Sequence, residues 1–108
     1  MRHYAPHIPL HLCTGTASAL WSAIAELRDA GRKVGVLLPA DWPSPAEPGV
    51  EIAHWGKWED PASLGAGLFA GLRRLEGSDA QVLVCPMPAP GGFRDALRDR
   101  LLKAARES

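Results

Sequence analysis

The most constraining feature of this 108-residue sequence is an alternation of short apolar runs with longer segments whose apolar residues recur every three or four positions. The run at 34–38, VGVLL, is apolar throughout, which is typical of a strand buried on both faces of a parallel sheet. In the segment before it, Leu20, Ile24 and Leu27 recur at helical spacing. Because helical crossovers join parallel strands, the alternation predicts an α/β domain.

Residues that cap or stop a helix place the boundaries of these elements. Thr16 can cap a helix that stops at Gly31, where we expect a left-handed glycine. Asp60-Pro61 is a strong helix start, and Gly77 ends that helix. The sequence therefore predicts a small three-layer, Rossmann-like α/β domain with a mainly parallel four-stranded sheet and three helices. We expect strands at 8–13, 34–38, 50–55 (an edge strand) and 81–85, helices at 17–30, 61–76 and 93–105, and irregular loops at 39–49 and 86–92.

Two of the expected helices carry further information about packing. The helix at 61–76 contains Gly65, Gly67 and Gly71, each of which costs about 1 kcal/mol relative to alanine. Such a helix either packs very closely on a neighbour or bends. In the last helix, the apolar stripe is expected to consist of Phe93, Leu97, Leu101 and Ala104.

Composition excludes several classes of protein. Lys and Arg together number 12, as do Asp and Glu, so no net charge favours DNA or a membrane surface. Cys13 and Cys85 lie in apolar runs without metal-ligand spacing, so we expect buried free thiols and no metal site. The sequence has no run long enough to span a membrane and no signal-peptide pattern, so we expect a cytoplasmic protein.

Candidate ligand-binding residues follow from the expected topology. In an open parallel sheet, ligands bind beyond the carboxyl ends of the strands, where the strand order reverses. That crevice would be lined by Thr14-Gly15-Thr16 and by the loop at 86–92, including Gly91 and Gly92, with Asp41 roughly where a ribose-binding acid would lie. The motif G-x-G-x-x-G and a Walker-type lysine are absent, so we prefer an ordinary glycine turn with a helix cap.

Two further groups of residues have competing interpretations. Trp42, Trp55 and Trp58 could stack on a base, but packing over the open edge of a small domain is the more common use. The basic residues of the last helix could bind RNA, but acidic residues at helical spacing, such as Asp95 before Arg98, favour a solvated face. The basic residues are Arg94, Arg98, Arg100, Lys103 and Arg106. From these patterns alone, no catalytic site is visible.

Short motifs spread along the chain resemble those of a known family. Residues 2–6 read R-H-Y-A-P, which resembles the end of the interdomain linker of long-form L-threonylcarbamoyladenylate synthases. Residues 68–73, LFAGLR, are similar to the family's L-[FY]-x-x-L-R, and residues 100–105, RLLKAA, to its closing motif. The chain is thereby identified as a member of this family, matching its Rossmann-like C-terminal (Sua-type) domain, and residues 1–7 would be a linker remnant and residues 8–108 the domain.

The resemblance implies a function that the residues alone do not reveal. The family makes threonylcarbamoyl-AMP from threonine, bicarbonate and ATP, for the threonylcarbamoyladenosine modification of tRNA. ATP, and with it Mg²⁺, would bind a YrdC-like catalytic domain that this sequence lacks, so no catalytic residue carries over. The linker residues Arg2, His3 and Tyr4 would cover the catalytic pocket. The alternatives are a stand-alone nucleotide- or anion-binding module and a tRNA-docking module.

Overall fold

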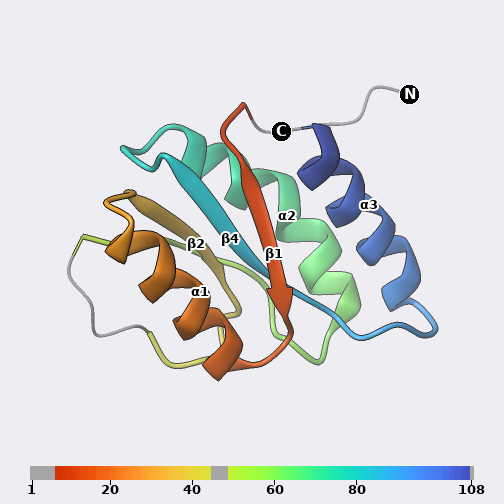
Figure 1. The fold of residues 1–108 in the computed structure, drawn as a ribbon. Helices are drawn as coiled ribbons and strands as arrows, with labels where there is room; N and C mark the ends of the chain where they lie inside the picture. The colour runs from red at the N-terminus through yellow and green to blue at the C-terminus, as the bar shows by residue number, and fades with distance from the viewer. Residues whose placement is uncertain (1–6, 45–48, 108) are drawn as a thin grey trace.

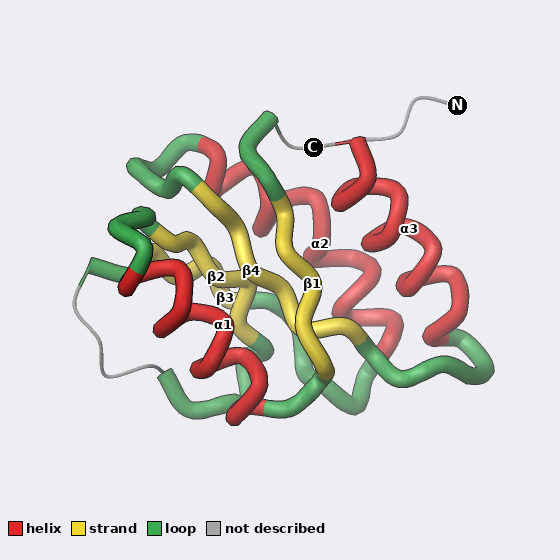
Figure 2. The backbone as a smooth tube through the Cα atoms, viewed as in Figure 1, coloured by secondary structure: helices red, strands yellow, loops and turns green. Residues whose placement is uncertain are grey.

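The computed structural model describes residues 7–44 and 49–107, and these residues form a sheet with helices on both faces (Figure 1). The strands are β1 (Leu10–Thr14), β2 (Val34–Leu38), β3 (Glu51–His54) and β4 (Val82–Met87). The helices are α1 (Ala17–Asp29), α2 (Pro61–Glu76) and α3 (Arg94–Glu107). The strand order is β1-β4-β2-β3, and every pair of neighbours is parallel. Figure 2 shows β4 between β1 and β2. The predicted fold class is confirmed, and β3 is an edge strand as expected.

The two faces of the sheet carry separate apolar clusters because side chains alternate along each strand. On one face, Val36 and Leu38 of β2 pack with Leu20 and Ile24 of α1. On the other face, Leu37 belongs to the cluster formed with the apolar residues of α2 and α3. Those helical residues are Leu64, Leu68, Leu72, Leu75, Leu97, Leu101 and Ala104. The all-apolar sequence of β2 thus reflects burial on both faces, as predicted.

The helix boundaries follow the capping residues. The Thr16 side chain accepts a hydrogen bond from the Ala19 amide at 3.1 Å, and the Asp60 carboxylate accepts one from the Ser63 amide at 3.3 Å. After α1, Gly31 has φ of +81°, the left-handed conformation expected there. Gly77 caps α2 with φ of −79°, so it ends the helix without needing the freedom of glycine.

The glycines of α2 act differently from one another. A Cβ atom at Gly71 would overlap with Cδ1 of Leu37, so the helix backbone lies directly on the sheet there. The nearest atom to a Cβ at Gly65 would be Nη1 of Arg100, 4.0 Å away, and at Gly67 it would be Cδ1 of Trp55, 3.6 Å away. The close packing that the sequence suggested is therefore confirmed at Gly71 and does not apply at Gly65.

β1 spans Leu10–Thr14 where a strand at 8–13 was expected, and two further predicted boundaries are wrong. β4 continues through Pro86 to Met87, where an irregular loop was expected. Beyond Val84 its registered pairing continues with β1 only, so a strand residue without an N–H is tolerated at Pro86. Phe93 was expected on the buried stripe of the last helix, but it precedes α3 and is 90% exposed. Gly91 and Gly92, with φ of +124° and +58°, turn the chain before the helix starts.

Candidate functional site

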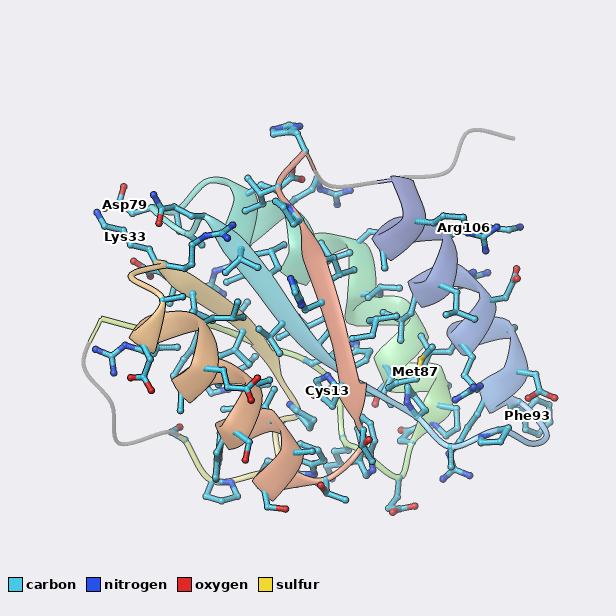
Figure 3. The ribbon with its side chains drawn as sticks, in the orientation of Figure 1. Cys13, Lys33, Asp79, Met87, Phe93 and Arg106 are labelled. Atoms are coloured by element: carbon cyan, nitrogen blue, oxygen red, sulfur yellow. The ribbon has the colours of Figure 1, made fainter. Side chains whose placement is uncertain are left out.

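The strand order creates a switch point at the carboxyl ends of β1 and β4. These strands are neighbours, but β1 leads into α1 on one face of the sheet and β4 leads toward α3 on the other (Figure 1). Because the two connections leave in opposite directions, a crevice opens between them. Figure 3 labels Cys13 and Met87 near these two strand ends.

A cavity of about 600 Å³ occupies this crevice. Its walls come from the ends of β1 and β4, from the turn before α2 and from one side of α3. The lining residues are Leu12, Cys13, Thr14, Gly15, Thr16, Trp58, Met87, Pro88, Ala89, Pro90, Arg98 and Leu102. The structure therefore brings Thr14, Gly15 and Thr16 together with the first part of the loop at 86–92, as the sequence predicted.

Gly15 lets the first wall of the cavity lie close to its neighbours. A Cβ atom there would be 2.6 Å from both the Met87 carbonyl oxygen and Cζ2 of Trp58. The backbone of the turn therefore lies against the strand end and the indole ring, a position that only glycine allows. Thr16 follows as the cap of α1, so its hydroxyl oxygen already accepts the Ala19 amide proton.

Trp58 forms a second wall and is held in place from several sides. Its backbone amide donates to Oδ1 of Asp41 at 3.0 Å. Its ring lies 4.9 Å from that of Trp42 and 6.2 Å from that of Trp55, measured between centroids. Trp55 is itself anchored, because its indole N–H donates to the Leu64 carbonyl at 2.7 Å. The expected tryptophan cluster thus exists and supports one side of the cavity.

Asp41, Gly91 and Gly92 are not among the residues that line the cavity. Asp41 instead supports the wall through its hydrogen bond to Trp58. The Gly91 amide donates to Oδ1 of Asp95 at 2.8 Å, which closes the turn before α3. A contact between Asp41 and a ribose, and a contact of the glycines with a ligand, stay predictions.

Sequence reasoning missed the third wall, which consists of Arg98 and Leu102 of α3. The guanidinium of Arg98 donates to the Pro88 carbonyl, so the helix holds the loop after β4. Leu102 is 44% exposed although it is a large apolar residue. The available signal was their spacing: residues four apart share one side of a helix, and Leu102 lies off the predicted buried stripe.

Several charges of α3 are already engaged. Lys103 pairs with Asp99 at 3.2 Å, and Arg94 pairs with Glu59 at 3.0 Å. Instead of forming the suggested pair, Asp95 accepts the Gly91 amide while Arg98 binds Pro88. The carboxylates of Glu59 and Asp99 offset the charges of Arg94 and Lys103, whereas Arg98 binds a neutral carbonyl.

The two cysteines are poor nucleophiles. Burial raises the pKa of Cys13 to about 11 and raises the pKa of the fully buried Cys85 well above its ordinary range. Both thiols are therefore protonated near neutral pH, and protonated thiols are unreactive. Neither one forms a disulfide.

At the other end of the sheet, the chain enters the domain through an anchored histidine. The backbone N–H of His7 donates to Oε2 of Glu76 at 2.9 Å, and Nε2 of His7 lies 3.1 Å from the same oxygen. The Glu76 side chain is only 8% exposed, so the contact joins a largely buried carboxylate to His7 at the surface. The predicted linker residues Arg2, His3 and Tyr4 lie outside the described residues.

Two features are absent from the described residues, 7–44 and 49–107. No three His, Cys, Asp or Glu side chains in this part of the chain are grouped so that they could hold a metal ion. None of its helices combines the length and apolar character needed to cross a membrane.

Comparison with known proteins identifies the class to which this α/β domain belongs. A sequence model of the C-terminal domain of threonylcarbamoyl-AMP synthase matches residues 1–106. The chain therefore belongs to the family of threonylcarbamoyl-AMP synthase C-terminal domains.

Two relatives agree with this assignment. The chain is 30% identical over 107 residues to the threonylcarbamoyl-AMP synthase of Bacillus subtilis (strain 168), covering 95% of this chain and 30% of that protein. The fold matches the crystal structure of P. abyssi Sua5 complexed with L-threonine, with a TM-score of 0.75 and 24% identity over 98% of this chain. This chain again spans 30% of the length of that protein.

Proposed function

We propose that this chain is an accessory domain that works with a YrdC-like catalytic domain in the synthesis of threonylcarbamoyl-AMP from threonine, bicarbonate and ATP. The product would feed the threonylcarbamoyladenosine modification of tRNA. The observation that carries the proposal is the family match over residues 1–106. The relatives are more than three times as long as the region they share with this chain, which leaves room for a separate catalytic domain.

The chemistry of the cavity supports an accessory role. The described residues that line it include no carboxylate, histidine or lysine, so they offer no general base for activating threonine or bicarbonate. The one thiol among them, Cys13, is protonated near neutral pH. ATP and Mg²⁺ would accordingly be held by the catalytic domain.

The linker would act between the two domains. Arg2 could offer a guanidinium to a phosphate or carboxylate, and Tyr4 an amphipathic ring that excludes water from the catalytic pocket. The contact between His7 and Glu76 fixes where the chain enters this domain, directly after that segment. An anchored end restricts the positions that the preceding residues can reach.

A chimera tests the proposal. The part of the Bacillus subtilis relative that matches this chain is replaced by residues 1–108, and pyrophosphate release is measured with ATP, threonine and bicarbonate. We expect activity from the chimera, and none from this chain alone or from the relative truncated before the shared region. A chimera as inactive as the truncated relative, although folded, would contradict the proposal.

The same chimera tests the linker. Arg2→Ala and Tyr4→Ala should each lower adenylate formation and leave the melting temperature of the 108-residue chain unchanged. Full activity of both variants would show that the segment only tethers the domains.

A further inference from the structure

The cavity at the ends of β1 and β4 has no role in the accessory function proposed above. We infer that it binds an adenine mononucleotide, with the base against Trp58 and the phosphate toward Arg98. The choice of adenine rests on the proposed function, in which ATP is consumed and an adenylate is formed. The choice of an aromatic ring joined to an anion rests on the walls of the cavity.

The size and lining of the cavity suit a small molecule. A volume of about 600 Å³ lies within the roughly 300–1,000 Å³ typical of ligand sites. Most of the wall is apolar, and the polar groups are few, as is usual in such sites. The polar side-chain groups are the hydroxyls of Thr14 and Thr16, the thiol of Cys13, the indole N–H of Trp58 and the guanidinium of Arg98.

The charge of the lining residues favours a negatively charged ligand. Among the described residues that line the cavity, Arg98 is the one with a charged side chain, and none of them is acidic. Its contact with the described chain is the hydrogen bond to the Pro88 carbonyl. A guanidinium has five N–H donors in a planar fork, so donors remain for the oxygens of a phosphate.

The aromatic wall is rigid before any ligand arrives. Trp58 is fixed by Asp41 through its amide and by Trp42 and Trp55 through its ring, yet it is only half-buried. A preorganised indole can stack on a base with little loss of conformational entropy. In the part of the wall that comes from α3, Leu102 is 44% exposed and would be covered by the ligand.

Isothermal titration of the 108-residue chain with AMP, adenosine and inorganic phosphate tests the inference. We expect saturable binding of AMP and weaker binding of each separate part, because only AMP uses both walls. No saturable binding of AMP at millimolar concentration would overturn the inference. Equal binding of phosphate and AMP would also overturn it, because the aromatic wall would then contribute nothing.

Variants locate the site. Arg98→Gln should weaken AMP binding by about tenfold or more, since a charge-assisted hydrogen bond is lost. Arg100→Gln removes the same charge from the same helix outside the cavity and is the matched control. If the two variants bind AMP equally well, the nucleotide lies elsewhere and the inference fails.

A second pair of variants remains useful if Arg98→Gln disturbs the loop after β4. Leu102→Glu places a carboxylate in the wall at an exposed position, and Leu102→Gln is its neutral match. We expect Leu102→Glu to weaken AMP binding well beyond Leu102→Gln, and adenosine binding to differ little between the two. Equal AMP affinities for this pair would overturn the inference.

These experiments separate the site from the proposed function. An active chimera combined with no AMP binding by the chain would refute the site and leave the accessory function intact. AMP binding by the chain combined with an inactive, folded chimera would refute the function and leave the site intact.

Discussion

The contact between α2 and the sheet predicts that replacing glycine by alanine stabilises the domain at Gly65 but not at Gly71. Replacing glycine by alanine in a helix interior gains about 1 kcal/mol from propensity alone. At Gly65 nothing opposes this gain, because the nearest atom to the new Cβ is the end of a flexible arginine, 4.0 Å away. We expect Gly65→Ala to stabilise the domain by about 0.5–1 kcal/mol.

At Gly71 the new methyl group would overlap with the side chain of Leu37, which extends from β2 toward the helix and is fully buried. Inserting a carbon atom into a packed core costs about 1–3 kcal/mol, because neighbours are forced out of their rotamers. This cost equals or exceeds the propensity gain, so Gly71→Ala should be neutral to destabilising by about 2 kcal/mol. The two variants should therefore differ by roughly 0.5–3 kcal/mol in the free energy of unfolding.

Urea unfolding followed by circular dichroism measures this difference. Both variants should keep the m-value of the parent chain, since the surface exposed on unfolding is nearly the same. If Gly71→Ala is stabilised as much as Gly65→Ala, the helix does not lie on the sheet as closely as the structure places it, and the reasoning fails.

Three other perturbations test the core, the cavity wall and the thiols. Leu72→Ala removes a fully buried side chain and should cost about 2–5 kcal/mol, seen as a clearly lower melting temperature; an unchanged melting curve would contradict the register of α2. Gly15→Ala should lower stability by about 1–3 kcal/mol, measured by urea unfolding, because its Cβ would lie 2.6 Å from the Met87 carbonyl oxygen; wild-type stability would refute that contact. Since burial raises the pKa of Cys13 to about 11, alkylation at pH 8 should be slow in the native chain and should accelerate as the pH rises toward 11, whereas rapid labelling at pH 8 would contradict this burial.

Local signals in the sequence were sufficient for the elements and their caps. Thr16 and Asp60 cap the helices they were expected to cap, because capping depends on a side chain and an amide only three residues away. The uniform apolarity of 34–38 correctly indicated burial on both faces. The prediction that Phe93 is buried was wrong because it also relied on a local signal, the spacing of apolar residues. Helical spacing relates Phe93 to Leu97 only if the helix has already begun, and two glycines with positive φ prevent that.

The candidate site could be predicted only in part, because it depends on contacts between distant segments. Thr14, Gly15 and Thr16 were found because every strand of a parallel sheet directs its carboxyl end to the same edge. The sequence does not state that β4 lies between β1 and β2, and that order puts the loop after β4 beside the turn after β1. Arg98 and Leu102 were missed for this reason. Their spacing shows that they share a helix face, but only the packing of α3 beside β1 shows what that face meets.

The same packing explains why an ordinary glycine turn and a ligand cavity are compatible interpretations of residues 14–16. The turn needs Gly15 for a structural reason, since the Met87 carbonyl and Trp58 leave no room for a side chain. Thr16 likewise uses its hydroxyl to cap α1. Yet these structural constraints also fix the backbone against an aromatic ring, in the lining of a cavity to which Arg98 also contributes. The residues that close the βα unit would therefore also form a rigid surface for the proposed ligand, and the ligand specificity would come from Trp58 and Arg98, which belong to other segments.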